Sequence, residues 1–421
     1  MKILVIGSGG REHAIIRQLK KNPLAETIYA LPGNPGMTEA ICLKADPMDI
    51  SQVVAMATAK RVDFCIVTPD DPLAIGLVDA LELHNIPCFG PGQKAAMIES
   101  SKLLAKQLMQ LYRIPTAAWQ AFTNTEEAIE YLRQQPLPVV VKADGLAKGK
   151  GVVVAKTLPE AETAVRDMLD KRVFGDSGAT VIIEECLEGQ EVSVMCLVDR
   201  YTVVPLLSAM DHKRALDGDN GPNTGGMGAI APCPFYTEEI ADICMRDIFL
   251  PTAHAMMQER VPFSGCLFFG LMLTKDGPKV LEYNARFGDP ETQAVLSLLS
   301  SDLLEALGAV RDGNLLPEHI TFKPGYACCV VAASQGYPGE FEKGLPITIE
   351  EGIEAAVHMA GVAEEGGQLV TSGGRVLGVT ATGDTLRAAI DKAYQAMDKV
   401  HFNNKYCRGD IGKQALRGLE G

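Results

Sequence analysis

The sequence lacks the features that mark membrane, secreted and zinc-binding proteins. Its longest apolar run is Cys266–Phe269, continued beyond a glycine by Leu271–Leu273, and this run is far too short to cross a bilayer. The 11 cysteines are odd in number and contain no C-x-x-C pair, and the 7 histidines show no metal-ligand spacing. Several cysteines lie in apolar runs, so we expect reduced, buried thiols in a cytoplasmic protein and neither a disulfide framework nor a zinc site.

Positive charge is also in short supply. The chain has 39 lysines and arginines against 53 aspartates and glutamates, and its net charge is −14. The summed field would repel a polyanion, so we expect no nucleic-acid partner, and any phosphate site must be local. The sequence enters a strand-like segment, KILVIG, directly after its first residue, so we expect neither a signal peptide nor a transit peptide and no membrane partner. For the oligomeric state we expect a monomer.

The order of strands and helices indicates a multidomain α/β and α+β fold. In the first ~100 residues short apolar strands alternate with helical stretches, which is typical of a doubly wound parallel sheet. We expect an amphipathic helix from Ala95 to Tyr112 and a long polar loop from Asp211 to Gly228. We predict an N-terminal substrate-binding domain, a two-lobed core with a mobile lid lobe and a small C-terminal α/β module, at residues 1–100, 101–325 (lid about 120–187) and 326–421.

The segment KVLEYNARFGDPETQ carries many polar groups beside an apolar neighbour, FFGLML. Glu282 and Asn284 are two residues apart on a predicted strand, so both side chains face one side and offer oxygen ligands to a hard cation such as Mg²⁺ or Mn²⁺. Arg286 supplies a cation for a phosphate, and Asp289 and Glu291 supply carboxylates for an amine. A strand with only a structural role has no reason to carry so many groups that are costly to desolvate.

A glycine-rich turn, Gly7–His13, follows the first strand and opens a helix. Amide groups at Gly9 and Gly10, together with Arg11, would form a phosphate cradle at this helix start. The dinucleotide fingerprint G-x-G-x-x-G fails because Glu12 replaces the third glycine, and no acidic residue ends the second strand. NAD binding is therefore disfavoured, whereas a tight turn with no ligand role stays open.

The stretch VVVKADGLAKGKGV places Lys142 at the end of a buried strand, where its charge needs a partner. The glycines, among them Gly149 and Gly151, can fold over a phosphate chain, and Lys148 and Lys150 add charge. A Walker loop would lead into a helix, but a strand follows here, which favours a β-hairpin flap. A solvated lysine-bearing turn is the alternative.

Two further segments carry candidate binding groups. In VIIEECLEGQEVSV, the backbone after Glu184-Glu185 can read an adenine edge and a carboxylate further on can hold ribose hydroxyls, with a solvated hinge as the alternative. The polar stretch DHKRALDGDNGPNTGGMGA favours a binding loop or lid over a connecting loop with no binding role. His212 as a catalytic base and His212 as a hydrogen-bonded loop residue both stay open.

Together these segments resemble the ATP-grasp ligases, and most closely the family of glycinamide ribonucleotide synthetases (phosphoribosylamine–glycine ligases). The resemblance extends from end to end of the chain, in the order and with the spacing of the family. It is carried by GSGGREHA, PGNPG, SKLLAK, IPTA, VVKADGLAKGKGV, FGD, VIIEECLEGQE, DHKRALDGDNGPNTGGMGA, KVLEYNARFGDPETQ, SGGRV and CRGDIG.

The resemblance implies a two-lobed ATP-grasp core and the ATP-dependent ligation of glycine to 5-phosphoribosylamine through glycyl phosphate, in de novo purine biosynthesis. The implied ATP-binding residues are Lys102, Lys142, Gly149, Lys150, Gly151, Glu184, Glu185, Leu187 and Glu191. Mg²⁺ or Mn²⁺ is implied on Glu282 and Asn284, and Lys213, Arg286 and Asp289 are the implied catalytic residues. The implied substrate-binding residues are Gly9, Gly10, Arg11, Asp70, Asp211, Asn223, Thr224, Gly225, Gly226 and Glu291.

The sequence departs from the family pattern at three places. Asp70 replaces a usual glutamate, Lys148 replaces a usual alanine in the flap, and the strand Phe268–Leu273 lacks the second metal-binding acid of many ATP-grasp relatives. We therefore expect metal coordination to depend on ATP oxygens and water as well. Another ATP-grasp carboxylate–amine ligase is the alternative function, and a nicotinamide-dependent dehydrogenase and a non-catalytic nucleotide sensor are the further alternatives.

Overall fold

The computed structural model describes residues 1–146 and 151–420, and its N-terminal part contains a five-stranded parallel sheet in the order β3-β2-β1-β4-β5. Residues Ile3–Ile6 of the central strand are completely buried, because helices cover both faces of the sheet. The predicted doubly wound parallel sheet is confirmed. Its elements are β1 (Lys2–Gly7), α1 (Gly10–Leu19), β2 (Thr27–Pro32), β3 (Ile41–Cys42), α2 (Ile50–Lys60), β4 (Phe64–Val67), α3 (Asp70–Ala74), α4 (Leu77–Leu83) and β5 (Cys88–Phe89).

The amphipathic helix predicted from Ala95 to Tyr112 is wrong as a single helix. The chain forms α5 (Gln93–Ser100) and α6 (Lys102–Leu111), separated by Ser101 in an extended conformation. The Ser101 hydroxyl accepts a hydrogen bond from the Leu104 amide, so a serine N-cap starts a second helix. Leu111, the last residue of α6, is 67% exposed. The break places Lys102 at the first turn of α6.

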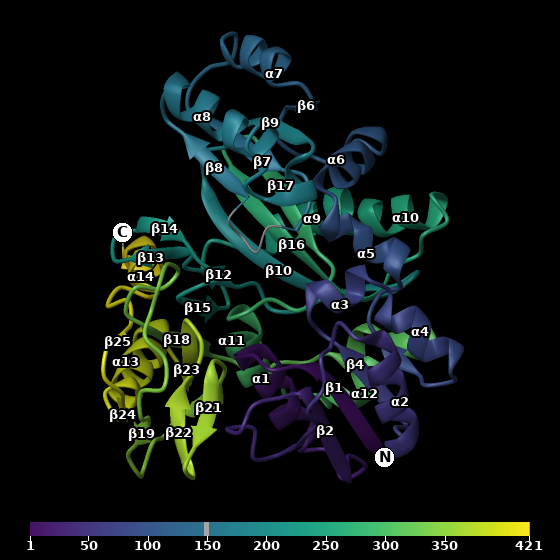
Figure 1. The fold of residues 1–421 in the computed structure, drawn as a ribbon, viewed down its shortest axis with the longest axis vertical. Helices are drawn as coiled ribbons and strands as arrows, with labels where there is room; N and C mark the ends of the chain where they lie inside the picture. Colours follow the sequence, from purple (N-terminus) through teal and green to yellow (C-terminus); the bar gives the residue numbers. More distant parts are fainter. Residues whose placement is uncertain (147–150, 421) are drawn as a thin grey trace.

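A separate lobe follows, drawn at the top of Figure 1. Its four-stranded sheet has the order β6-β9-β7-β8, and its buried side chains form a hydrophobic cluster of their own. This independent core is the physical basis for a lobe that could move, and the mobility itself stays a prediction. The elements are β6 (Trp119–Phe122), α7 (Thr125–Leu132), β7 (Val139–Ala143), β8 (Val152–Ala155), α8 (Leu158–Leu169), the 3-10 turn Gly175–Gly178 and β9 (Val181–Glu185).

The central sheet is antiparallel, with the strand order β11-β10-β16-β17. A tight turn at residues 275–276 joins β16 to β17, and a β-bulge interrupts their pairing next to Gly270. The two antiparallel sheets are the two lobes of the predicted ATP-grasp core. The elements of this part are β10 (Gln190–Asp199), β11 (Val203–Pro205), α9 (Glu238–Cys244), a π-helical turn (Met245–Phe249), α10 (Leu250–Gln258), β16 (Ser264–Thr274), β17 (Gly277–Asn284), α11 (Glu291–Ser297) and α12 (Leu303–Asp312).

The C-terminal part mixes strands and helices, as predicted for a small α/β module. Its main sheet has the order β12-β15-β18-β23-β20, so two strands from the preceding part, β12 (Met210–Asp211) and β15 (Gly228–Ala231), complete it. The other elements after α12 are the 3-10 turn Pro317–His319, β18 (Tyr326–Ser334), β19 (Thr348–Ile349), β20 (Ala356–Met359), β21 (Val362–Glu365), β22 (Gln368–Thr371), β23 (Arg375–Gly383), α13 (Leu386–Met397), β24 (Val400–His401), β25 (Lys405–Tyr406) and α14 (Lys413–Glu420).

The long polar loop predicted from Asp211 to Gly228 is wrong, because this stretch contains a β-hairpin. β13 (Arg214–Leu216) pairs with β14 (Asn220–Asn223) in an antiparallel two-stranded sheet. Gly218 and Asp219 both have positive φ, of 68° and 54°, which is the backbone that a tight hairpin turn requires. The Asp-Gly pair at its start was the sequence signal for this turn.

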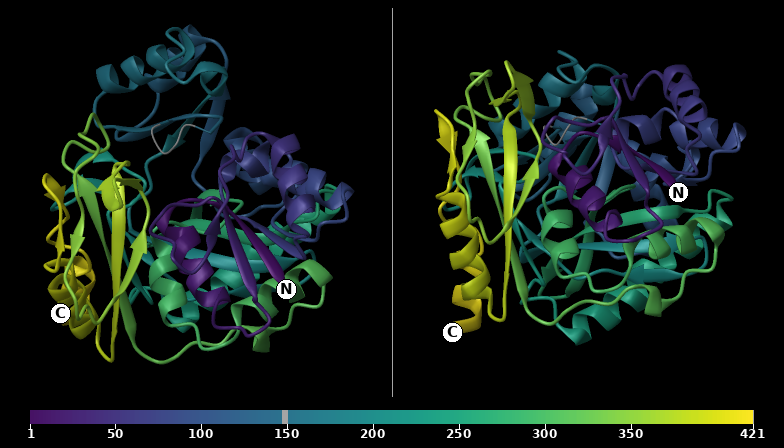
Figure 2. Two further views of the ribbon diagram at one scale, coloured as in Figure 1. Left: turned by 60° about the horizontal axis from the view of Figure 1, so that its bottom comes forward. Right: turned by 90° about the horizontal axis from the view of Figure 1, so that it is seen from below.

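The N-terminal and C-terminal parts lie side by side beneath the central sheet, with the separate lobe on its other side (Figures 1 and 2). α11 contacts both parts, since it packs on α1 and on β15, β18 and β23. The loop between β17 and α11 is thereby held where the parts meet. Within the described ranges, none of the helices combines the length and apolar character of a membrane span.

Candidate active site

β17 delivers two candidate metal ligands to one face of the central sheet. Glu282 lies opposite Gly270 and Asn284 opposite Phe268, so the two side chains share a face, as predicted. A Cβ at Gly270 would lie 3.1 Å from Glu282 Cγ, so glycine leaves room for the carboxylate. Burial alone would raise the pKa of Glu282, but nearby lysines and Arg286 hold this pKa below its ordinary value. The carboxylate is therefore ionised and able to bind a cation.

A buried carboxylate from α5 supports the end of β17. Glu99, only 7% exposed, accepts hydrogen bonds from Asn284 Nδ2 (3.0 Å) and the Ala285 amide (2.7 Å), and pairs with Arg286 Nη2 (3.0 Å). Because the Asn284 amide nitrogen is engaged, its Oδ1 is the atom left for a cation. Burial would lower the pKa of Arg286, but Glu99 and Asp70 raise it above its ordinary value, so Arg286 stays charged. Glu99 was not among the predicted site residues.

The inward lysine of β7 has the partner that its burial requires. Lys142 Nζ lies 3.0 Å from Glu184 Oε2 and donates to the Leu281 carbonyl (3.1 Å), at the bulge in β17. Lys106, buried on α6 and not predicted, lies 2.9 Å from the same Glu184 oxygen. Glu184, which was expected to frame adenine, is 2% exposed. Two lysines bind its Oε2, and its Oε1 has no partner among the described residues. Its role toward adenine stays a prediction.

Lys102 lies at the base of the predicted flap. Its Nζ donates to the carbonyls of Gly145 (2.9 Å) and Asp144 (3.4 Å), and burial lowers its pKa. The Ala143 amide donates to the Gly151 carbonyl (2.8 Å), which joins the two ends of the flap as a hairpin requires. The predicted flap residues Lys148, Gly149 and Lys150 lie outside the described ranges.

The connector between β9 and β10 holds the predicted adenine-reading backbone. Glu185 Oε1 accepts hydrogen bonds from the Ala118 amide (3.0 Å) and from Lys279 Nζ (3.3 Å), so its side chain braces the connector. Leu187 is half-buried in the connector. Gly189 has φ +155°, and a Cβ there would collide with the Leu273 carbonyl, so only glycine allows this close approach to β16.

Lys213 connects the predicted ribose carboxylate to the predicted metal ligand. Its Nζ lies 2.6 Å from Glu191 Oε1 and 3.5 Å from Glu282 Oε1. Burial would lower the pKa of Lys213, but Glu191, Glu282 and Asp211 raise it well above its ordinary value. A permanent positive charge therefore stands between the two carboxylates, as the predicted catalytic role requires.

Asp289, predicted to be catalytic, is held by an ion pair and a side-chain hydrogen bond. Its Oδ2 lies 2.9 Å from Arg375 Nη2, and its Oδ1 accepts a hydrogen bond from Gln293 Nε2 (2.6 Å). Arg375 also donates to the carbonyls of Asp289 and Gly225, both at 2.7 Å. These contacts fix the Asp289 carboxylate, and its catalytic role stays a prediction. Tyr337, Arg375 and the Gly9–Gly10 turn line a hollow of about 260 Å³ next to this carboxylate.

Two groups of the predicted phosphate cradle at the start of α1 have a partner within the protein, the Glu12 carboxylate. Glu12 Oε2 accepts the hydrogen bond of the Gly9 amide at 2.6 Å, in the capping-box pattern. Glu12 Oε1 accepts from Arg11 Nε (2.5 Å) and from the Thr68 hydroxyl (2.8 Å). Glu12 therefore binds both the Gly9 amide and Arg11 Nε, and the phosphate role of this turn stays a prediction. The adjacent Gly10 lies against Gln293, whose Nε2 would be 2.8 Å from a Cβ at this position.

Asp211 and Glu291 form a second acidic region beside Lys213. Glu291 is buried and accepts a hydrogen bond from the Ser193 hydroxyl at 3.3 Å. Burial and the charge of Glu291 raise the pKa of Asp211 well above its ordinary value. Such a pair gains stability when a cationic group binds between the carboxylates. Asp70 lies half-buried at the first turn of α3, and its charge acts on Glu99 and Arg286.

The glycine-rich end of the hairpin is fixed by its own hydrogen bonds. The Thr224 amide and hydroxyl both donate to the Lys213 carbonyl, at 2.7 and 2.8 Å, and Asn223 pairs with Arg214 in the hairpin register. The Gly225 amide donates to the Tyr337 hydroxyl (3.0 Å). Gly226 has φ +110°, and a Cβ there would lie 2.7 Å from Asp211 Oδ1. These residues hold the walls of the site in place.

His212 is not a catalytic base. Its Nδ1 lies 3.2 Å from the Gly228 carbonyl, and its Nε2 accepts a hydrogen bond from the Gly412 amide at 3.1 Å, so both ring nitrogens are engaged. Burial lowers the pKa of His212 to about 4, and the ring is neutral at physiological pH. The open question is settled in favour of a structural histidine.

Three family models match consecutive parts of the chain. The N domain, the ATP-grasp (A) domain and the C domain of phosphoribosylglycinamide synthetase match residues 1–99, 100–292 and 327–414. The chain belongs to the phosphoribosylglycinamide synthetase family. It is 46% identical over 413 residues to a phosphoribosylamine–glycine ligase of Caldanaerobacter subterraneus subsp. tengcongensis, with 98% of this chain and 99% of that protein covered. It is 45% identical over 423 residues to one of Vibrio cholerae, with 99% of each covered.

Solved structures support the synthetase fold. The crystal structure of phosphoribosylamine–glycine ligase from Thermotoga maritima matches with a TM-score of 0.84 and 34% identity, covering 98% of this chain and all of that one. The biotin carboxylase domain of a Hydrogenobacter thermophilus 2-oxoglutarate carboxylase, solved with magnesium ADP, matches with a TM-score of 0.75 at 18% identity. It covers 96% of this chain and 91% of that one, and it shows the fold alone.

In this synthetase, the structure brings together most of the predicted polar residues around β17. Those with local patterns, such as Glu282, Asn284 and Lys142, lie as expected. The residues missed are their supports, namely Glu99, Lys106, Gln293, Tyr337, Arg375 and Arg408. Lys106, Arg375 and Arg408 lie within the family motifs SKLLAK, SGGRV and CRGDIG, and membership of these motifs was the sequence signal that could have identified them.

Proposed function

We infer that the chain catalyses the ATP-dependent ligation of glycine to 5-phosphoribosylamine, which yields glycinamide ribonucleotide, ADP and phosphate. The observation that carries this inference is the identity of 45–46% over almost the whole chain to relatives named phosphoribosylamine–glycine ligase. The reaction belongs to de novo purine biosynthesis. The protein is an ATP-dependent carbon–nitrogen ligase, and ATP-grasp enzymes of this kind use ATP with a divalent metal.

The chemistry sets three tasks for the site. A glycine carboxylate oxygen attacks the γ-phosphorus of ATP and ADP leaves; the amine nitrogen then attacks the acyl carbon of glycyl phosphate, and phosphate and a proton leave. The carboxylate is a poor acyl donor until it is phosphorylated. The site must therefore neutralise phosphate charge, align the reacting atoms and exclude water from the acyl phosphate.

The cations around β17 suit the first of these tasks. We propose that Lys102 and Lys142 bind ATP phosphates, and that Lys213 and Arg286 stabilise the transferred phosphoryl group. Carboxylates hold the last two in their charged state. Glu184 would act by fixing Lys142, to which it is paired at 3.0 Å.

The remaining groups suit recognition of nucleotide and substrates. We propose that the connector at Glu185 and Leu187 reads adenine and that Glu191 binds ribose. Asp211 and Glu291 would receive the positively charged amine of a substrate, because burial raises the pKa of both carboxylates in its absence. We propose the phosphoribosylamine site at the hollow between the Gly9–Gly10 turn and the C-terminal part. We further propose that Asp70, Arg11, Asn223 and the glycines at 225–226 contribute to binding this substrate.

The donor set on β17 fits magnesium or manganese. In the part of the chain that the structure describes, no cluster of three or more His, Cys, Asp and Glu side chains could hold a metal by itself. Mg²⁺ commonly takes only one or two protein ligands together with substrate phosphates and water. We propose that Glu282 and Asn284 Oδ1 hold it; when bound there it would neutralise charge on the ATP phosphates. We also propose that the protein is a cytoplasmic monomer without a nucleic-acid partner, in keeping with its net charge of −14.

Phosphate release, measured with every combination of the three substrates, tests this function. The proposal expects rapid release only when ATP, glycine and 5-phosphoribosylamine are all present. Turnover with another amino acid in the absence of phosphoribosylamine would favour a different ATP-grasp carboxylate–amine ligase. ATP binding without turnover in any mixture would favour a nucleotide sensor.

A further inference from the structure

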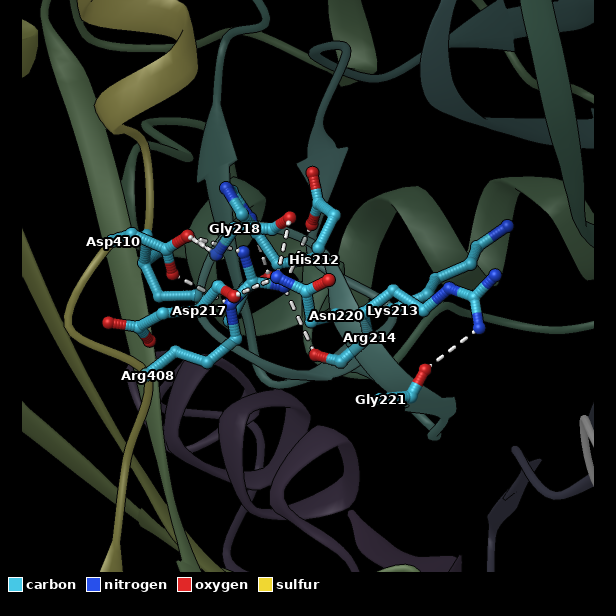
Figure 3. Close-up of polar contacts among 12 residues, drawn as sticks. His212, Lys213, Arg214, Asp217, Gly218, Asn220, Gly221, Arg408 and Asp410 are labelled. Atoms are coloured by element: carbon cyan, nitrogen blue, oxygen red, sulfur yellow. Dashed lines mark hydrogen bonds and ion pairs between the residues drawn. The ribbon is translucent and has the colours of Figure 1, made fainter.

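The hairpin that carries Lys213 at its base has no larger sheet to support it. β13 and β14 pair only with each other in the described structure, and a two-stranded hairpin alone is marginally stable in water. The segment Arg408–Gly412, between β25 and α14, lies against this hairpin (Figure 3). This contact joins distant parts of the sequence, since His212 and Gly412 are 200 residues apart.

Arg408 is the central residue of this contact. Its side chain is 1% exposed, the largest fully buried side chain among the described residues. Nε and Nη2 bind the two Asp410 oxygens at 2.7 and 2.8 Å, and Nη1 donates to Asp219 Oδ1 (2.9 Å) and to the Arg214 carbonyl (3.1 Å). Asp410 Oδ2 in turn accepts a hydrogen bond from the Gly218 amide at 2.7 Å. The arginine fork thus joins the first strand of the hairpin to its turn.

The same segment holds both sequence neighbours of Lys213. Arg408 binds the Arg214 carbonyl on one side, and the Gly412 amide binds His212 Nε2 on the other. Figure 3 shows Arg408 and Asp410 on one side of the hairpin, with the Lys213 side chain extending away from them. The Lys213 ammonium group reaches Glu191 and Glu282, whereas the hydrogen bonds of Arg408 go to Asp410, Asp219 and the Arg214 carbonyl.

We propose that Arg408 is a positioning residue for the ligation reaction, which acts by fixing the Arg214 backbone next to Lys213 and the turn of the hairpin. The proposal rests on the role proposed above for Lys213. A catalytic group must be held to within about 0.5 Å, and its supporting residues determine whether it is. Arg408 provides this support at a distance, because its planar fork makes four hydrogen bonds that a lysine at the same position could not reproduce.

A double-mutant cycle with Arg408→Lys and Lys213→Ala tests the proposal. In steady-state kinetics we expect Arg408→Lys to lower kcat about tenfold, with the KM values for ATP and glycine within about twofold of wild type. Adding Arg408→Lys to Lys213→Ala should cause no further loss, because the arginine acts only through the lysine. Arg417→Lys on α14, an exposed arginine of the same region, is the matched control and should behave as wild type.

The outcomes separate this inference from the proposals on which it rests. The positioning role would be overturned if the decreases in kcat of the two single variants multiply in the double variant. It would also be overturned by a normal kcat in Arg408→Lys. Normal turnover of Lys213→Ala would overturn the role of Lys213 instead, and absence of ligase turnover in the wild type would overturn the proposed reaction. If Arg408→Lys does not fold, Asp219→Asn removes one bond of the same fork, and it should show a smaller loss that also vanishes in the Lys213→Ala background.

Discussion

Glu99 binds the amide nitrogen of Asn284 at 3.0 Å, which attaches the last helix of the N-terminal part to the strand that carries the candidate metal ligands. The same carboxylate binds the Ala285 amide and Arg286. One buried acid thus orients a metal ligand and a phosphate-binding cation together. Residues that orient metal ligands in this way commonly alter metal affinity when they are changed.

Glu99→Gln is therefore expected to weaken metal binding without removing a metal ligand. The glutamine NH₂ group would face either the Asn284 NH₂ group or the Ala285 amide, so one of the two hydrogen bonds that hold the end of β17 is lost in either orientation. We expect the half-saturating Mg²⁺ concentration for ligase turnover to rise at least about tenfold. In an Asn284→Ala background the same change should have little further effect on this concentration. An unchanged Mg²⁺ requirement in Glu99→Gln would contradict the orienting role.

Glu282→Ala should abolish turnover while the fold survives. The variant loses the only carboxylate proposed to bind the metal, and we expect a loss of about 100-fold or more in kcat. Circular dichroism and the thermal midpoint should stay near those of the wild type, because Lys213, which lies 3.5 Å from Glu282, keeps Glu191 as a partner at 2.6 Å. The control is Asp276→Ala, which lies in the exposed turn between β16 and β17. A near-normal rate for Glu282→Ala would refute the metal assignment.

The sequence predicted the parts of the site that depend on local periodicity. Glu282 and Asn284 share a face because side chains alternate along a strand, and Lys142 required a partner because it faces inward from a buried one. The parallel sheet at the N-terminus followed from its alternating strands and helices in the same way. Each of these predictions depends on local sequence alone and not on the contacts between segments that are distant in the chain.

The supporting residues could not be predicted, because their partners are far away in the chain. Glu99 and Asn284 are 185 residues apart, and Arg375 and Asp289 are 86 apart. The partner of the Gly9 amide could not be predicted for a different reason. The glycine pattern indicates exposed amides, but it does not show which of them find partners in the folded protein. Here the Glu12 carboxylate accepts the hydrogen bond of the Gly9 amide.

Lys142→Ala should raise the ATP concentration needed for turnover. Lys142 lies on β7 shortly before the flap, and Glu184 keeps Lys106 as a partner when Lys142 is lost. We expect an increase of about tenfold or more in the KM for ATP, with a smaller change in the KM for glycine. Steady-state kinetics at varied ATP measures it, and an ATP dependence equal to that of the wild type would argue against a phosphate role.

Lys106→Ala provides the contrast for this experiment. Lys106 is completely enclosed by protein, donates to the Thr116 hydroxyl (2.8 Å) and pairs with Glu184. Its removal leaves a buried carboxylate with one partner, so the free energy of unfolding should fall by about 3 kcal/mol. A variant that kept full stability and instead lost ATP affinity as Lys142→Ala does would show that both lysines bind phosphate.

The neutral His212 should make the fold sensitive to acid between its unfolded and folded pKa values. The pKa of the histidine is 6.5 in the unfolded chain and about 4 in the folded protein, where burial and Arg408 oppose its charge. Above pH 6.5 the ring is neutral in both states. As the pH falls from 6.5 to 4 the unfolded state gains the proton first, so stability decreases, by roughly 3 kcal/mol in all.

Chemical denaturation at a series of pH values measures this effect. His212→Gln keeps a donor and an acceptor but cannot titrate, so its free energy of unfolding should fall less steeply than that of the wild type across this range. Subtraction of the two curves removes the contribution of other buried groups, including His358, whose pKa burial lowers to about 3. Parallel curves would mean that His212 accepts a proton in the folded protein, and the hydrogen bond from the Gly412 amide to its Nε2 would then have to break.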